Sequence, residues 1–189
     1  SVYRELGEFQ KAKDLLERSL NIYKKHFSEN HTRTAWVLFL LGEVYKDLKD
    51  YDTAEIYFKK SLSMYEKNYG RDHIENTKIL AKLGELFLLK GEVDQGEEYL
   101  NRALSISSKT HHPWSYYSLE ALADLYAIKS SQAVEKGKDQ EADLLRKKAI
   151  EYLHQACHIV DRHFSKEAPQ VQRIHQKLKD FESSLKLKT

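Results

Sequence analysis

Two histidines four residues apart, His154 and His158, are the side chains whose spacing first suggests chemistry. On a helix this spacing puts two imidazoles on one face, where they can share a zinc ion. A zinc protease also requires a glutamate directly after the first histidine, but Gln155 stands there and no third ligand follows at a suitable spacing. Between them, Cys157 matches Leu62 of an internal repeat, which is a predicted core position. We therefore expect surface histidines, no metal and no cofactor.

Other catalytic patterns are missing from the sequence. The seven glycines are scattered and form no phosphate-binding loop, and no serine stands in a nucleophile elbow. The 12 tyrosines suggest stacking on nucleobases, but packing is the better explanation because four fall on repeat-core positions: Tyr23, Tyr45, Tyr51 and Tyr65. The basic stretch KLKDFESSLKLKT is amphipathic and would allow a membrane or nucleic-acid contact, although a capping helix explains it more simply. We predict a protein that is not an enzyme and binds neither nucleic acid nor membrane.

The composition favours helices joined by short loops, and the cysteine count fits a reducing compartment. Only 7 Gly and 2 Pro occur in 189 residues, which leaves little material for turns. The formal charge of +2 creates no field for nucleic acid or a membrane surface. The single cysteine excludes an internal disulfide, and the longest apolar run, residues 35–41, is far below the ~20 residues of a membrane span. The predicted location is cytoplasmic.

A repeat of 42 residues organises the chain, because residues 54–95 fall on residues 12–53. The matched pairs are Ala54 with Ala12, Leu62 with Leu20, Tyr65 with Tyr23, His73 with His31, and Gly84 with Gly42. A fixed period of this length is typical of stacked supersecondary units. Apolar residues recur at helical spacing, and polar breaks at 28–32, 49–50 and 91–92 predict the turns. Thr32 or Thr34 is the predicted N-cap of the helix after the first break.

The ends of the repeated region predict a single domain over residues 1–189. Residues 1–11 match 43–53, which predicts a helix end, a turn at Gly7 and a new helix, as in a truncated repeat of a longer solenoid. Residues 12–53 and 54–95 are regular repeats. Larger side chains would overpack the places where paired helices approach most closely. The small residues expected at these places are Gly42, Gly84, Ala123, Ala12, Ala54 and Gly96.

The third unit, residues 96–148, is 11 residues longer than the others. We expect both of its helices to be prolonged and to meet at Gly137, with Asp139 capping the second; a disordered loop is the alternative. Pro113 suits the start of the first. Residues 149–168 are the last repeat helix, and residues 169–187 form a C-terminal capping helix. The apolar stripe of this capping helix consists of Val171, Ile174, Leu178, Phe181 and Leu185. We expect the stripe to pack on the last repeat of a monomer, and the alternative is that it forms the seam of a dimer.

The repeat resembles the tetratricopeptide (TPR) repeat of the 42-residue type found in kinesin light chains. The resemblance rests on Leu38, Leu41, Gly42, Tyr45, Tyr51, Ala54, Phe58 and Ser61, and on their counterparts Leu80, Leu83, Gly84, Phe87, Val93, Gly96, Leu100 and Ala103. His112-Pro113 restores the His-Pro of the family's inter-repeat linker. The Asn that kinesin light chains often carry is replaced by Leu40, Lys82 and Ala121. The similarity covers residues 1–175.

This resemblance implies an all-α, right-handed superhelical solenoid of antiparallel helix pairs, whose first helices line a concave groove for a peptide or protein. Carried over by register, the groove positions are Trp36, Phe39, Glu43, Lys46 and Asp47, then Lys78, Ala81, Glu85, Leu88 and Leu89, then Tyr117, Glu120, Asp124, Ala127 and Ile128. Five are acidic and two basic, which favours a partner with basic residues beside an apolar anchor, unless the charges are only a solvated face. The alternative function is a regulatory domain whose groove holds a segment of its own chain.

Overall fold

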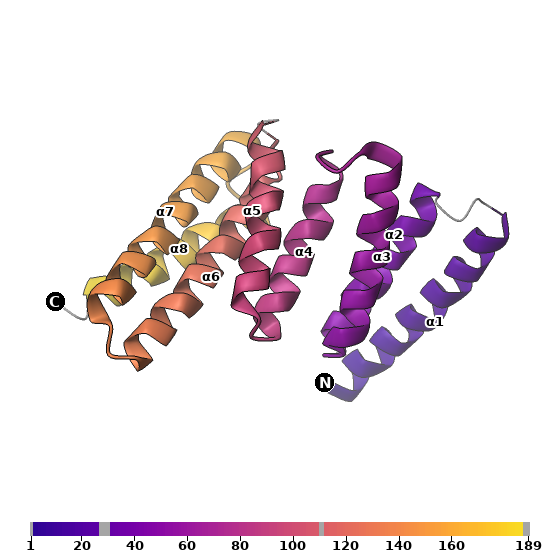
Figure 1. Cartoon of the computed structure of the whole chain (residues 1–189), viewed down its shortest axis with the longest axis horizontal. Helices are drawn as coiled ribbons and strands as arrows, with labels where there is room; N and C mark the ends of the chain where they lie inside the picture. The colour runs from indigo at the N-terminus through magenta and orange to yellow at the C-terminus, as the bar shows by residue number, and fades with distance from the viewer. Residues whose placement is uncertain (1, 27–30, 110–111, 187–189) are drawn as a thin grey trace.

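The computed structural model is a stack of antiparallel helices and describes residues 2–26, 31–109 and 112–186 (Figure 1). Within these residues the helices are α1 (Val2–His26), α2 (Thr32–Asp47), α3 (Tyr51–Tyr69), α4 (Asn76–Leu89), α5 (Val93–Lys109), α6 (Ser115–Glu135), α7 (Asp139–His163) and α8 (Pro169–Lys186). They follow one another from α1 at one end of the molecule to α7 and α8 at the other. We call α2, α4 and α6 the first helices, and their partners α3, α5 and α7 the second helices. The all-α solenoid predicted from the repeat is confirmed.

Glycines allow the paired helices to approach closely. A Cβ atom on Gly42 would lie 2.6 Å from Cδ1 of Phe58, and one on Gly84 would lie 2.4 Å from Cγ of Leu100. Real Cβ atoms do not approach other atoms this closely, so only glycine admits these two large side chains. Phe58 and Leu100 are fully buried as a result. The small residues in the repeat therefore define the contact within each helix pair.

A histidine lies just before each first helix. The Nδ1 atoms of His31, His73 and His112 accept hydrogen bonds from the backbone N–H two residues further on, at 3.1, 3.3 and 3.3 Å. His31 is the N-cap of α2, so the prediction of Thr32 or Thr34 was wrong. The imidazole accepts from the Arg33 amide, one of the amides in the first turn of α2 that have no partner within the helix. Pro113 precedes the N-cap of α6, and α6 itself begins at Ser115.

The predicted turn at Gly7 is absent, because α1 runs without a break from Val2 to His26. The turns that close the later helix pairs contain a residue with positive φ: Lys49 at 63°, Gly91 at 79° and Gly137 at 69°. Gly7 has no such conformation and lies within the helix. Continuing the helix pairs the backbone amides and carbonyls around Gly7 within it, whereas a separate short helix would have to meet its own nucleation cost.

The expanded third unit forms two long helices rather than a loop. α6 has 21 residues and α7 has 25, against 14 and 17 in the preceding pair. They meet at Gly137, as predicted, and the buried Ser130 hydroxyl donates to the Ala142 carbonyl at 2.8 Å across the extension. Asp139 is the first helical residue and not the cap. The N-cap is Lys138, which makes no side-chain capping bond.

α8 packs on the last repeat as the predicted cap. Its residues Val171, Ile174 and Leu178 are buried in the same core cluster as residues of α6 and α7. This part of the stripe is covered by the chain itself, which leaves it unavailable as the seam of a coiled-coil dimer. The side chain of Leu185 lies outside the described residues. Over the part of the chain that the structure describes, none of the helices combines the length and apolar character needed to cross a membrane.

Candidate functional site

The His-Cys-His segment of α7 is not assembled as a metal site. His154 points to Glu182 of α8, with 3.2 Å between Nε2 and Oε1, while Cys157 is buried in the core. Over residues 2–26, 31–109 and 112–186, no three His, Cys, Asp or Glu side chains gather closely enough to hold a metal ion. The core position predicted for Cys157 is confirmed. Within the segment, Cys157 contributes to the core, while His154 and His158 are exposed.

We expect the Cys157 thiol to be unreactive in the folded protein. Burial, together with the nearby carboxylates of Asp161 and Glu182, raises its pKa to about 11. At pH 7.5 the thiolate is therefore scarce, and iodoacetamide should label the native protein at least ~10-fold more slowly than the urea-unfolded protein. Mass spectrometry of the labelled chain gives both rates without ambiguity, because Cys157 is the only cysteine. Equal rates in the two states would contradict the assignment of Cys157 to the core.

A row of alternating charges begins on the first helices α2 and α4. Glu43 lies 3.5 Å from Lys46 on its own helix and 4.0 Å from Lys82 of α4. The Lys82 ammonium donates to Glu85 at 2.7 Å. Burial alone lowers the pKa of Lys82, but Glu85 and Glu43 more than reverse this and raise it above its ordinary value. The row therefore links neighbouring repeats through partly buried ion pairs.

The same row continues from α6 to α8. The Arg173 guanidinium of α8 donates two hydrogen bonds to the Glu120 carboxylate, of 3.0 and 2.7 Å. Lys177, one turn further, donates to Asp124 at 2.7 Å. Burial raises the pKa of Asp124, although Lys177 lowers it in part. α8 therefore adds two cations to the face that α6 shares with α2 and α4.

These pairs change the charge expected for the groove. All five acidic positions have a basic neighbour, since Asp47 also lies 3.6 Å from Lys46. The sequence count of two basic groups omitted Lys82, Arg173 and Lys177, and with them five cations balance five carboxylates. Cations of the chain therefore lie beside all the acidic groove positions, and the preference for a partner with basic residues stays a prediction.

Two other predicted groove residues pack against the protein itself, Phe39 being buried and Leu88 half-buried. Phe39 is only 1% exposed and lies beneath Trp36, with ring centroids 5.1 Å apart. Leu88 packs over Gly96 of α5, where a Cβ would come within 2.9 Å of its Cδ2 atom. Leu88 fills the space that Gly96 leaves, so it belongs to the helix-pair contact. Phe39 supports the site from below.

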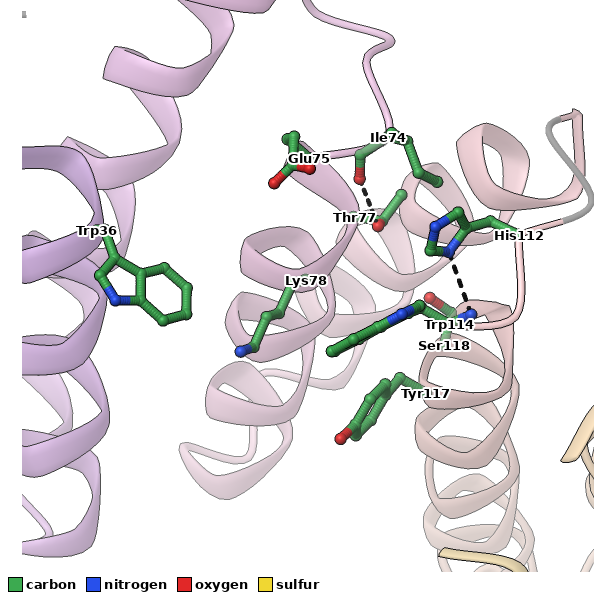
Figure 2. A pocket seen from close by; sticks show the side chains of 9 residues that line it. All are labelled: Trp36, Ile74, Glu75, Thr77, Lys78, His112, Trp114, Tyr117 and Ser118. Atoms are coloured by element: carbon green, nitrogen blue, oxygen red, sulfur yellow. Dashed lines mark hydrogen bonds between the residues drawn. The ribbon is translucent and has the colours of Figure 1, made fainter. Parts of the chain in front are cut away.

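A cavity of about 290 Å³ opens between the N-terminal turns of α2, α4 and α6 (Figure 2). Trp36 comes from α2, Lys78 from α4, and Trp114 with Tyr117 from α6. Figure 2 shows the Lys78 side chain reaching between the two indoles. Both tryptophans are unusually exposed for their size, at 41% and 45%. Three predicted groove residues, Trp36, Lys78 and Tyr117, are thus brought to one cavity.

Lys78 is held by aromatic faces instead of by a carboxylate. Its Nζ atom lies 4.7 Å from the ring centroid of Trp36, 4.9 Å from that of Phe39 and 5.7 Å from that of Trp114. Partial burial lowers the pKa of Lys78 below its ordinary value, although Glu43 acts in the opposite direction. The cation is thus partly dehydrated at the cavity wall, where a ligand can accept its hydrogen bonds.

Sequence reasoning missed the part of this cavity built by the first helical turns. Trp114 stands one turn before Tyr117, and in register it matches Glu75, which also lines the cavity. His112 lines it as well while its Nδ1 atom accepts from the Trp114 amide. A tryptophan three residues before a groove position was the available sign, because the two positions share one helix face.

Comparison with known proteins places the chain in a family. Tetratricopeptide repeat models match residues 1–67 and residues 77–110, which together make up more than half of the chain. The chain belongs to the tetratricopeptide repeat family. The comparison with curated proteins found no similar sequence.

Solved structures support the same fold. A putative kinesin light chain from Podosopora anserina with nearly identical TPR-like repeats is 19% identical with a TM-score of 0.64, and the match covers 98% of this chain and 89% of that one. A point variant of the same protein has a TM-score of 0.65 at 19% sequence identity, and the match covers 98% of this chain and 88% of that one. BtubC (BKLC) from P. vanneervenii is 12% identical with a TM-score of 0.57, over 97% and 76%. At these identities the likeness concerns the fold.

Proposed function

We propose that the chain is a protein-interaction module that holds an extended segment of a partner protein along α2, α4 and α6. The observation that carries this proposal is the cavity that exposes Trp36 and Trp114 on one face. Large exposed aromatic side chains are the residues that most often dominate binding energy at protein interfaces. The repeat family, which serves protein interaction, supports the same class of function.

The partner proposed here carries an apolar anchor, with basic residues placed beside it. The anchor supplies most of the affinity, because the carboxylates along the groove already have cations of the chain as neighbours. Basic residues of the partner would compete with Lys46 and Lys82 for Glu43 and Glu85, and in this way they would fix the register of the bound segment.

Charge reversal on the first helices tests this proposal. We expect Glu43→Lys with Glu85→Lys to weaken binding of the natural partner by at least ~10-fold, because two new cations would stand beside Lys46 and Lys82. The partner is first recovered by cross-linking to the wild-type protein, then purified and titrated by calorimetry against both proteins.

A matched control carries the same change in net charge on the second helices. Glu98 of α5 and Glu151 of α7 are exposed, so Glu98→Lys with Glu151→Lys should leave the affinity within about twofold. Circular dichroism confirms that both double variants are folded. If the groove variant and the control bound the partner equally well, the groove would not be the binding site for a basic segment.

A further inference from the structure

The cavity between the first helical turns holds both tryptophans of the chain. Trp36 and Trp114 belong to helices separated by α4, and they face the same space from opposite sides (Figure 2). Each is braced by a second ring, Trp36 by Phe39 at 5.1 Å and Trp114 by Tyr117 at 5.7 Å. The site is therefore a pair of supported, exposed indole faces, which is a surface built for flat or ring-shaped ligand groups.

The spacing of the indoles suggests which backbone fits between them. The Lys78 Nζ atom is 4.7 Å from one ring centroid and 5.7 Å from the other, so the centroids are no further apart than the sum, 10.4 Å. A polyproline II helix rises ~3.1 Å per residue with three residues per turn, so side chains on one edge recur every ~9.3 Å. The spacing of two prolines three residues apart therefore falls within this upper limit.

Three hydrogen-bond donors, the Lys78 ammonium and the two indole N–H groups, line the cavity beside one carboxylate, that of Glu75. Among the described residues, the Lys78 ammonium has no carboxylate within 4 Å, and neither indole N–H has a hydrogen-bond acceptor. A polyproline II segment makes no internal hydrogen bonds, so every one of its carbonyls is free to accept. A helical ligand would offer free backbone carbonyls only in its last turn, because its own amides bond to the others. The donor set thus favours an extended, carbonyl-presenting ligand.

The cation between the rings also limits other ligands. A lysine or arginine placed against the two indoles would bring a second cation beside the Lys78 ammonium, which like-charge repulsion disfavours. A wholly apolar side chain would cover the ammonium without accepting its hydrogen bonds, which is unfavourable. Proline rings on the indoles with a carbonyl above Lys78 satisfy both demands.

We propose that Trp36, Lys78 and Trp114 form a binding site for a proline-rich segment in the polyproline II conformation. Two prolines three residues apart stack on the two indoles, and Lys78 donates to a carbonyl between them. Grooves lined by aromatic rings bind proline-rich segments because this backbone is preformed and loses little entropy on binding. The inference rests on the proposed function and specifies the segment of the partner that enters this cavity.

Tryptophan fluorescence reports on this site alone, because Trp36 and Trp114 are the only tryptophans in the chain. We expect decaproline to change the emission saturably, while a glycine-serine peptide of equal length leaves it unchanged. Calorimetry then gives the affinity of each variant for decaproline. Trp36→Ala and Trp114→Ala should each weaken binding at least ~10-fold, since buried aromatic contacts dominate such sites. Lys78→Met, which keeps the apolar stem, should weaken it about threefold to tenfold.

Leu144→Ala is the control for these variants, because Leu144 is 68% exposed on α7 and does not line the cavity. It should bind decaproline like the wild-type protein. Trp36→Phe is a second control, which separates loss of the binding surface from loss of the fold. It keeps an aromatic ring stacked on Phe39, so it should retain measurable binding of decaproline. Circular dichroism establishes that each variant is folded.

Three results would overturn the proposal: no saturable response to decaproline, equal affinity in the tryptophan variants, or tighter binding of a lysine-rich or glutamate-rich decapeptide than of decaproline. The fate of the proposed function is separate. If the natural partner depends on Glu43 and Glu85 while decaproline does not bind, only the proline-rich segment is refuted. If the partner ignores both the charge reversals and the tryptophan variants, the groove function falls as well.

Discussion

Phe58→Ala is expected to lower the free energy of unfolding by about 3–5 kcal/mol, the usual cost of removing a fully buried phenylalanine. Phe58 is completely buried in α3, and its ring fills the space opposite Gly42. Gly42 has no side chain to move into the resulting cavity, so the site cannot collapse from that side. The lost contacts add to the lost transfer free energy, which places the expected effect toward the upper end of this range.

The same substitution should also weaken the candidate site. Phe58 lies 5.6 Å from Phe39, and Phe39 stacks under Trp36 at 5.1 Å, so the three rings form a continuous support. Urea unfolding followed by circular dichroism gives the stability, and the tryptophan emission, which comes from Trp36 and Trp114, reports the change at the cavity.

Ile56→Ala on the same helix is the matched control, because Ile56 is exposed and its truncation should change stability by no more than about 0.5 kcal/mol. A loss of less than 1 kcal/mol for Phe58→Ala would contradict the proposed tight contact between Phe58 and Gly42.

Gly84→Ala has the second largest expected effect, a loss of about 1–3 kcal/mol from overpacking. The new Cβ would lie 2.4 Å from Cγ of Leu100 and 3.2 Å from the backbone carbonyl oxygen of Gly96. Leu100 is fully buried and has little room to move, and the carbonyl belongs to the partner helix, so α4 and α5 must separate. The loss is predicted even though alanine is favoured over glycine within a helix by about 1 kcal/mol.

Gly7→Ala is expected to change the stability of the same protein in the opposite direction. Gly7 lies within α1, and a Cβ there would meet no atom within 4 Å. Helix propensity then acts alone and should raise stability by about 0.5–1 kcal/mol. Thermal unfolding of the two glycine variants beside the wild-type protein measures both effects. If Gly84→Ala were as stable as Gly7→Ala, close approach of α4 and α5 would not explain the glycine of the repeat.

The fold was largely predictable from local pattern. Three signals predicted it: the period of 42 residues, the helical spacing of the apolar positions and the small residues of the pair contacts. All three concern residues within one helix pair, so the structure expected for one unit applies to the next. Even the lengthened third pair and the capping stripe on α8 followed from residue spacing. The errors lie at Gly7, at the N-cap of α2 and at Asp139, where a helix end depends on which of several nearby groups takes the backbone amides.

The candidate site was predicted less well, because register gives the direction of a side chain but not its partner. Leu88 was assigned to the groove, yet it fills the space above Gly96. Trp114 was overlooked, although it forms one wall of the cavity with Trp36. Both outcomes depend on contacts between helices.

By itself, then, the sequence determined the repeat, the helix pairs and their glycine contacts, because these follow from the periodicity and size of residues close in the chain. Only the tertiary structure decided that Arg173 and Lys177 neutralise Glu120 and Asp124, and that Lys78 stands between Trp36 and Trp114. These contacts join different repeats and are set by how the pairs stack on one another. Long side chains can choose among several neighbours, and the stacking geometry selects one.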